Sequence, residues 1–270
     1  MKRKPVDEQV VVVMEAAGGI GRQTALELAR AGARLVVSAT SLAALESLVA
    51  EIRHGGGHAI AAFADASVFA HVSEVARTAE RELGGLDTWV QPAAAAVDKS
   101  FDKITPAELA QVIAQGLVGQ AYGAMAAIPV MKRNGGGQLI HISSVEAELA
   151  LPARGVWAAA ERGVAGMLDS LRIELKRDGV PIAITNVIPP VYDPGRVAKE
   201  IVRLAVRPRR EVILGVAGKA LVALRRHFPR LAEAMLTGDR PAPKRLGAIE
   251  TTPDEPFLDH TERDVPLVRS

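Results

Sequence analysis

A short run of β-branched residues leads into a glycine-rich turn and then into a helical pattern, and this succession constrains the fold most. Val10–Val13 precedes the turn 18–21 (Gly-Gly-Ile-Gly), and apolar residues then recur at helical spacing over 24–30 before Gly32. Such a turn lets backbone amides approach a diphosphate at the N-terminus of the helix. The pattern therefore predicts strand, turn and helix, with either a bound dinucleotide or tight helix–sheet packing as the reason for the glycines.

The same alternation of strand and helix continues along the chain. Further strands are predicted at 34–38, 59–64, 88–90, 138–142, 182–188 and 211–214. Further helices are predicted at 42–53, 68–83, 106–131, 156–176, 193–205 and 216–236, and the third of these begins with Thr105, Pro106 and a capping-box Glu108. Strands that alternate with helices of this length form parallel sheets with right-handed crossovers. We therefore expect an α/β fold, a doubly wound parallel sheet in three αβα layers with a C-terminal helical extension.

Length and composition indicate one globular domain followed by a tail. The chain has 270 residues, 49% of them hydrophobic and 24% charged, which is typical of a globular chain and not of a disordered or membrane-embedded one. After Gly238 prolines and charges dominate and the periodicity is lost. We predict a domain over 6–236 and a flexible or loosely docked tail over 237–270.

Charge and cysteine content exclude several classes of function. The formal net charge is +2 and there is no cysteine, so the sequence predicts no nucleic-acid partner, no disulfide framework and no thiol nucleophile. The histidines show no ligand spacing, and no metal site is predicted. The apolar runs are too short for an export signal or a membrane span. We expect a cytoplasmic protein.

Several stretches resemble the short-chain dehydrogenase/reductase (SDR) family, over about residues 10–236. They are 11–21, 64–65, 84–87, 128–129, 136–144 and 179–186. The resemblance implies a Rossmann-like domain, NAD or NADP as cofactor, and oxidation or reduction of alcohols and carbonyls. It also implies dimers or tetramers built from two long helices.

The positions that match the family's cofactor contacts are only partly kept. They are Gly19, Ile20, Gly21, Thr40, Asp65, Ala66, Ala93 and Ala94. Glu15 replaces the first glycine of the family motif, which places a carboxylate at the turn unless its side chain points to solvent or pairs with Arg22. The resemblance implies an acid near Ala39 for NAD or a base near Thr40 for NADP, and this chain has neither. Asp65 matches the acid beside the adenine, but it could equally cap the next helix. We therefore expect NAD or NADP binding that is weak or lost.

Most of the family's catalytic residues are absent. The resemblance implies a Ser, a Tyr thirteen residues later, a Lys four residues beyond the Tyr, and an Asn in the preceding long helix. Here these positions are Ser144, Trp157, Glu161 and Gly116. Trp157 cannot be the acid–base because an indole has no group that titrates near neutral pH, and a glutamate in place of the lysine disfavours a phenolate. Ser144 is the one surviving match, and we favour a role for it as a hydrogen-bond partner of its own loop.

Neither a replacement active site nor a substrate lid is predicted. His141 lies near Ser143 and Ser144 on the strand 138–142, but strand alternation places Ser144 on the face opposite His141. After the strand 182–188, residues 189–192 lead directly into the next helix, so we predict that the family's substrate-covering segment is deleted.

Basic residues outnumber acidic ones between 196 and 246. Apolar residues recur among them at helical spacing: Leu221, Leu224, Phe228, Leu231 and Met235. The last helix could lie on an anionic membrane, bind a partner, or pack its apolar side on the sheet with its arginines solvated. The third interpretation is favoured.

Two hypotheses about function follow. The first is a non-catalytic homologue, a pseudoenzyme, that acts by nucleotide binding or protein association; the alternative is an NAD(P)-dependent oxidoreductase that uses other residues on an alcohol or carbonyl. Small residues, Gly123 and Gly166 among them, recur in the helices at 106–131 and 156–176. We expect a homo-oligomer through these helices, or pairing with an active relative, unless the small residues serve packing within the chain.

Overall fold

A parallel sheet of seven strands forms the centre of the protein, in the order β3-β2-β1-β4-β5-β6-β7. The computed structural model describes residues 3–94, 97–149, 151–189 and 193–237. The strands are β1 (Val10–Val13), β2 (Arg34–Ala39), β3 (His58–Phe63), β4 (Thr88–Pro92), β5 (Gly137–Ile142), β6 (Ile182–Ile188) and β7 (Glu211–Ile213). The order reverses between β1 and β4, as in a doubly wound fold. The predicted fold class is confirmed.

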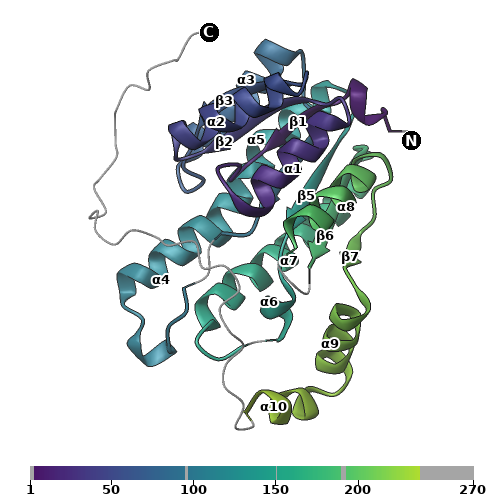
Figure 1. The fold of residues 1–270 in the computed structure, drawn as a ribbon. Helices are drawn as coiled ribbons and strands as arrows, with labels where there is room; N and C mark the ends of the chain where they lie inside the picture. Colours follow the sequence, from purple (N-terminus) through teal and green to yellow (C-terminus); the bar gives the residue numbers. More distant parts are fainter. Residues whose placement is uncertain (1–2, 95–96, 150, 190–192, 238–270) are drawn as a thin grey trace.

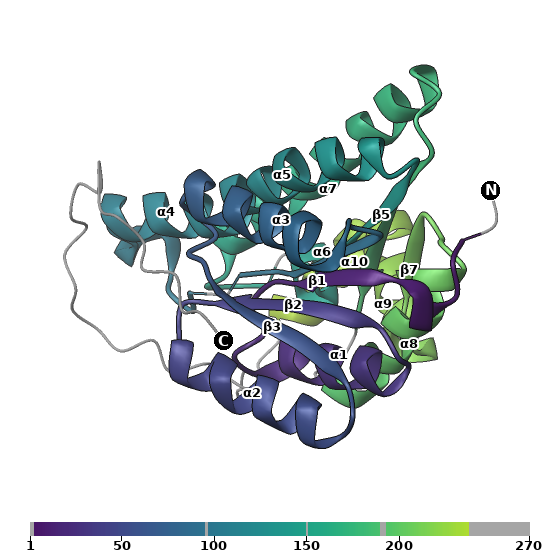
Figure 2. The ribbon, with the colours of Figure 1, turned by 90° about the horizontal axis from the view of Figure 1, so that it is seen from above.

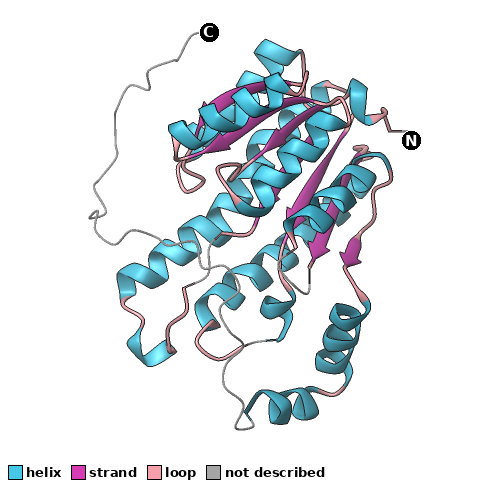
Figure 3. Cartoon of the chain, in the orientation of Figure 1, coloured by secondary structure: helices cyan, strands magenta, loops and turns pink. Residues whose placement is uncertain are grey.

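Helices cover both faces of the sheet (Figures 1 and 2). One face carries α1 (Gly19–Arg30), α2 (Leu42–His54) and α8 (Pro194–Val206), and the other carries α3 (Phe69–Leu83), α5 (Gly119–Arg133) and α7 (Gly155–Arg177). The remaining helices are η1 (Val6–Glu8), η2 (Phe101–Lys103), α4 (Pro106–Ile113), α6 (Val145–Leu149), α9 (Val216–His227) and α10 (Pro229–Thr237). Figure 3 shows that helices make up most of the region beyond the carboxyl ends of β5–β7.

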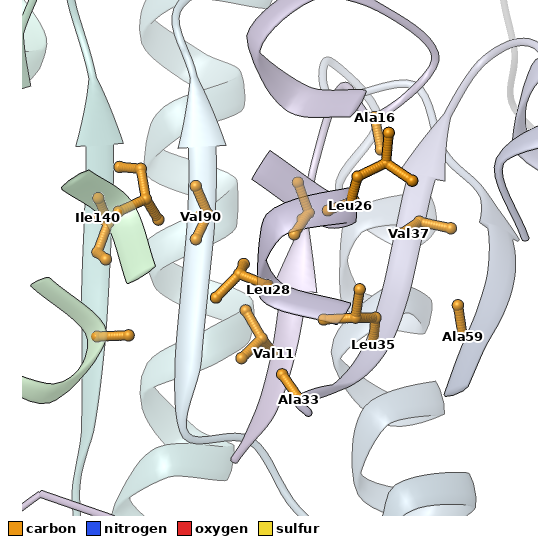
Figure 4. Close-up of a cluster of buried hydrophobic side chains, with 14 of the residues drawn as sticks. Val11, Ala16, Leu26, Leu28, Ala33, Leu35, Val37, Ala59, Val90 and Ile140 are labelled. Atoms are coloured by element: carbon orange, nitrogen blue, oxygen red, sulfur yellow. The ribbon is translucent and has the colours of Figure 1, made fainter. Parts of the chain in front are cut away.

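The central strand β1 is buried on both faces. Val11 and Val13 pack into the cluster under α1, α2 and α8, part of which Figure 4 shows with Leu28 and Leu35. Val10 and Val12 point the other way, toward α3, α5 and α7. A strand covered on both faces has no polar side, which is why β1 reads as an unbroken run of valines.

Helix starts follow the capping signals in the sequence. The Oγ1 of Thr105 accepts the backbone N–H of Glu108, whose carboxylate accepts the N–H of Thr105, so the predicted capping box of α4 is confirmed. Asp193 accepts the N–H of Arg196 at 3.0 Å and starts α8 as predicted. Side chains that satisfy the free N–H groups of a first turn set where the helix begins.

One predicted helix is wrong in its continuity, another is continuous but contains a π-helical turn, and one short helix is additional. The helix predicted at 106–131 consists of α4, a π-helical turn at Ala114–Val118 and α5. The helix predicted at 216–236 is broken after His227, because Pro229 lacks an N–H and its ring excludes a continuous helical backbone. The helix α6 forms between β5 and α7, in a segment without a periodic pattern of apolar residues.

Some predictions fall outside the described residues. They concern most of the tail, at 238–270, and residues 190–192 of the connection between β6 and α8. Within the described ranges, no helix has both the length and the apolar composition needed to cross a bilayer.

The two methionines of α5 test how far the core determines stability. Met131 is fully buried between α5 and the sheet, whereas Met125 on the same helix is exposed. We expect Met131→Ala to lower the free energy of unfolding by about 2–5 kcal/mol because it leaves a cavity. The matched Met125→Ala variant should change it by less than about 0.5 kcal/mol. Urea unfolding measures both, and equal effects would contradict the packing described here.

Candidate nucleotide-binding site

The predicted cofactor positions meet at one edge of the sheet. The turn before α1 follows β1, Thr40 follows β2, Asp65 and Ala66 follow β3, and Ala93 and Ala94 follow β4. All these strands are parallel, so their carboxyl ends lie together, beside the reversal of strand order between β1 and β4. In open α/β sheets this crevice is where ligands bind.

The turn before α1 combines a required glycine with a strained glutamate. A Cβ at Gly21 would lie 2.2 Å from the carbonyl oxygen of Glu15, so only glycine lets α1 pack this closely on the turn. A Cβ at Gly18 would meet nothing within 4 Å, which leaves open space beside the N-terminus of α1. Glu15 has φ of +53°, in the left-handed region that favours glycine. The backbone therefore keeps the shape of a glycine turn although a glutamate occupies it.

Glu15 carries its charge into the site without a cationic partner among the described residues. Arg22 pairs with Glu51 on α2, so the predicted alternative of a Glu15–Arg22 pair is wrong. Partial burial, and secondarily the nearby carboxylate of Asp65, raise the pKa of Glu15 above its usual value. A partly buried carboxylate beside the turn repels a phosphate group and so weakens its binding to the turn.

Asp65 closes the turn that leads into α3. Its Oδ1 accepts the backbone N–H of Ser67 at 2.8 Å and the Ser67 hydroxyl at 2.6 Å. These bonds form a local Asx turn. The N-cap of α3 is Val68, which has no side-chain cap bond, so the predicted alternative that Asp65 caps this helix is wrong, and adenine recognition by Asp65 stays a prediction. Ala66 is buried against Gly119 on α5, where a Cβ on the glycine would lie 3.0 Å from the Ala66 carbonyl oxygen.

Trp157 fills the position of the family's tyrosine. Its indole N–H donates to the carbonyl oxygen of Ala94 at 3.1 Å, and its ring is buried. The apolar cluster around it comprises Val112, Ala147 and Val156, with Ala93, Val97, Ile104 and Ile113 at its margin. Arg154, which is paired with Asp98 and Glu146, lies 5.9 Å from the ring centroid. Trp157 therefore joins the segment after β4 to α4, α6 and α7 as part of the packing.

Ser144 takes part in local backbone structure. Its Oγ accepts the N–H of Glu146 at 3.1 Å, at the start of α6. This is the hydrogen bond with its own loop that the sequence favoured. Gly116, at the position of the family's asparagine, lies in the π-helical turn, where a Cβ would meet that of Ala160 at 3.1 Å.

Glu161 and His141 form a buried pair that the sequence analysis did not predict. His141 Nε2 lies 3.1 Å from Glu161 Oε2, and His141 Nδ1 lies 3.0 Å from Gln120 Oε1. The Gln120 amide donates to the Pro92 carbonyl at 2.8 Å, which orients its oxygen toward the imidazole. Nδ1 therefore donates to Gln120, and Nε2 and Oε2 hold one proton between them. The other carboxylate oxygen, Oε1, is buried without a hydrogen-bond partner among the described residues.

No local sequence pattern predicts this network, because its three members come from separate elements, α5, β5 and α7. The hint in the sequence is a polar residue, His141, between two isoleucines of the strand 138–142. Buried polar side chains need partners, so such a residue predicts that a partner exists but not which one.

Comparison with known proteins places this architecture in a family. A sequence profile described as "short chain dehydrogenase" matches residues 9–203. The chain belongs to the short-chain dehydrogenase family. The predicted resemblance is confirmed.

Two bacterial proteins are among those similar to this chain in sequence. The chain is 28% identical over 261 residues to the uncharacterized oxidoreductase YxnA of Bacillus subtilis, covering 87% of this chain and 73% of that protein. It is 31% identical over 185 residues to a 3-oxoacyl-[acyl-carrier-protein] reductase of Synechocystis, covering 68% of this chain and 74% of the reductase.

Two solved structures of the family share the fold. A metagenomic short-chain oxidoreductase in complex with NADP has a TM-score of 0.71 at 26% identity, over 77% of this chain and 96% of that one. A short-chain dehydrogenase from Burkholderia phymatum in complex with NAD has a TM-score of 0.79 at 20% identity, over 84% and 96%. The second likeness, at this identity, concerns the fold alone.

A double-mutant cycle tests the buried pair. His141→Leu leaves the Glu161 carboxylate buried and unpaired, and we expect it to lower the free energy of unfolding by about 3–5 kcal/mol. Glu161→Met removes the other partner and should cost about 1–3 kcal/mol. The double variant replaces both groups by apolar ones and should be more stable than His141→Leu alone. Urea unfolding measures the cycle, and strictly additive effects would refute the pairing.

Proposed function

We propose that this chain binds a dinucleotide of the NAD(P) class at the carboxyl edge of its sheet and does not perform the proton transfer for which the family uses a tyrosine and a lysine. The observation that carries the second half is the bond from the Trp157 indole to the Ala94 carbonyl. It commits the only donor of the indole to the backbone, at the place where a proton would have to be exchanged with substrate.

The adenosine and diphosphate half of the cofactor fits the residues present. The space beside Gly18 is open, and the amides of the first turn of α1 are available to phosphate oxygens. Thr40 is exposed at the end of β2, where the adenosine ribose would lie. Glu15 opposes binding through its charge, so this half supports binding that is weak but present.

The nicotinamide half fits poorly. A bound nicotinamide ring would supply or accept a hydride, and the matching proton would have to be held by a side chain of the protein. Trp157 holds none, and Glu161 is turned to His141 inside the molecule, where it leaves no cation for a ribose hydroxyl. The chain therefore retains a nucleotide edge without the groups that complete the reaction.

The comparisons support the nucleotide half of this proposal. The metagenomic relative is described in complex with NADP, and the chain aligns with nearly all of that structure. Neither an acid nor a base near Ala39 and Thr40 favours one cofactor, so we propose no preference between NAD and NADP. In this proposal the protein acts by nucleotide binding or by protein association, and not by hydride transfer.

An NAD(P)-dependent oxidoreductase with another proton donor is the second candidate function. It is favoured by the relative from Synechocystis, a reductase by name, and by Ser144, which lies partly exposed at the same sheet edge. In that case turnover of the nucleotide with carbonyl compounds should depend on Ser144.

Direct titration with NAD, NADH, NADP and NADPH tests nucleotide binding, and turnover separates the two functions. We expect saturable binding by calorimetry and no oxidation of NADPH or NADH by carbonyl compounds above background. A turnover that Ser144→Ala abolishes would favour the oxidoreductase instead. Absence of binding by all four nucleotides would overturn both candidates.

The ionisation of Glu15 makes a pH-dependent prediction. Its raised pKa means that lowering the pH from about 8 to about 5 protonates it before an ordinary glutamate, whose pKa is about 4.3. The affinity for NAD should therefore rise as the pH falls. Glu15→Gln should bind more tightly at neutral pH and show a flatter pH profile, and Glu15→Gly should also bind more tightly.

The same pKa shift has a consequence for stability. A carboxyl whose pKa is raised on folding stabilises the fold below its unfolded pKa and loses that contribution as the pH rises through the folded value. Glu15→Gln should therefore stabilise the protein at neutral pH but not near pH 4. Glu46→Gln, on an exposed position of α2, is the control and should change neither profile. If Glu15→Gln kept the wild-type pH profiles of nucleotide affinity and of stability, the assignment of a charged Glu15 at the turn would be contradicted.

Self-association through α5 and α7 remains a proposal. Four glycines of this region pack inside the chain: Gly116, Gly119, Gly123 and Gly163 have side chains or backbone within 3.1 Å of an added Cβ. The expectation that Gly123 faces a partner is wrong, since its Cβ would lie 1.9 Å from Gln91 Oε1 in the sheet. Gly166 meets nothing within 4 Å, and Met125 and Ile173 are exposed on the same two helices. We propose that this surface joins two copies, or a copy and an active relative.

Gly166→Arg tests the assembly. We expect the wild type to have the mass of a dimer or tetramer by light scattering, and the variant to shift toward the monomer because a long cation cannot be accommodated at a close helix contact. Ala43→Arg, at an exposed position of α2, is the matched control and should keep the wild-type mass. A monomeric wild type at micromolar concentration would refute the proposal.

A further inference from the structure

The last two described helices, α9 and α10, contribute no residue to the nucleotide edge or to the proposed assembly surface. The helix α9 packs on α6 and the end of β6 through Leu221 and Val222. The helix α10 packs on α9, with Ala232 buried (Figure 1). The remaining sides of the two helices face away from the sheet.

Bulky apolar side chains gather on the outer side of α10. Phe228 is 63% exposed, Leu231 54% and Met235 57%. Leu231 and Met235 are four residues apart and so share one side of the helix, and Phe228 precedes its first residue. We call these three residues the apolar stripe. No described side chain covers them, and an apolar surface of this kind on a helix of a globular protein marks an interaction site.

Cations accompany the apolar stripe. Lys219, Arg225 and Arg230 form no ion pair with any residue in the described part of the chain, whereas Arg226 is paired with Glu148 and Glu211. The single acid of the two helices is Glu233. The pair of helices therefore combines exposed apolar groups with an excess of positive charge.

We propose that α9 and α10 dock the protein on an anionic lipid surface, with the apolar stripe in the interface and Lys219, Arg225 and Arg230 at the phosphate groups. Helices that lie in a bilayer interface have this composition, with apolar residues inserted about 5–10 Å and Lys or Arg at the headgroups. A second copy is a poorer occupant, because a twofold contact through the same stripe would bring the cations of the two copies together. The docking is peripheral, because none of the described helices is long and apolar enough to cross a bilayer.

Docking at this place would orient the molecule. The helix α9 begins just beyond the carboxyl end of β7, and the nucleotide edge also lies at the carboxyl ends of the strands. The lipid surface would therefore lie on the side of the molecule from which a nucleotide approaches. This inference does not depend on the proposed function.

Vesicle cosedimentation of the full chain tests the docking. Vesicles of phosphatidylcholine alone are compared with vesicles of equal parts phosphatidylcholine and phosphatidylglycerol. We expect binding to the anionic vesicles only, with most of it lost in about 1 M salt, where the screening length falls to about 3 Å. The double variant Leu231→Glu, Met235→Glu should reduce the bound fraction by about tenfold, since it places two charges in the interface.

Two controls keep the result interpretable. Leu42→Glu with Ala43→Glu places two charges at exposed positions of α2 in the same way and should bind like the wild type. Phe228→Trp adds a fluorescent reporter at the stripe. The two native tryptophans are already buried, so a shift of the emission to the blue reports on the new one, and we expect it only with anionic vesicles. Phe101→Trp, at another exposed phenylalanine, should not shift.

Five outcomes would overturn the proposal. They are absence of binding to anionic vesicles, equal binding to both kinds of vesicle, and wild-type binding by the Leu231→Glu, Met235→Glu variant in its folded state. The fourth is binding only after removal of residues 238–270, which would show that the tail covers the stripe in the full chain. A change of solution mass in the double variant, without a change in lipid binding, would assign the stripe to a second copy and reject the lipid.

Discussion

Burial of both faces of β1 is the constraint on which the rest of the structure depends. Its four valines are almost without exposed surface, and they can be so only if a helical layer lies on each side of the sheet. Parallel neighbours on both edges then require crossover helices, and right-handed crossovers in opposite directions place α1 and α2 on one face and α3 and α5 on the other. The carboxyl ends of the strands meet at one edge as a result. The position of the nucleotide edge is therefore a consequence of covering both faces of the sheet with helices.

Trp157 and Glu161 occupy the positions of the family's tyrosine and lysine, and both side chains are buried and hydrogen-bonded within the fold. An indole has one donor and needs one acceptor, which Ala94 supplies. A buried glutamate needs a partner that shares or balances its charge, and His141 supplies it from the neighbouring strand. Both residues sit on α7 but bond to other elements, Trp157 to the segment after β4 and Glu161 to β5. They therefore tie the sheet edge to the helix that in the family carries the reacting groups.

The turn at Glu15 and the outer side of α10 are two places where local preference and surroundings disagree. Glu15 keeps a left-handed backbone that glycine would adopt more easily, because α1 packs against its carbonyl through Gly21. Phe228 and Leu231 are exposed, although the helical spacing of the apolar residues in their segment predicts a side packed on the sheet. At Glu15 the fold keeps a strained backbone and a partly buried carboxylate. On α10 no described side chain covers the apolar residues, which is why this surface carries a proposal about a lipid surface.

Local sequence determined most of the elements of this protein, and tertiary structure decided what their side chains do. Period-two and period-3.6 patterns, and caps such as Thr105 and Asp193, act between neighbours in the chain, so strands and helix starts could be predicted from them. Pro229 is itself a local signal for the break between α9 and α10, but the helical spacing of apolar residues on both sides of it predicts one continuous helix. By contrast, the His141–Glu161 pair and the inward direction of Gly123 join residues that only the packed sheet and helices bring together. A side chain's partner depends on the three-dimensional arrangement of distant segments, and no periodicity along one segment contains that information.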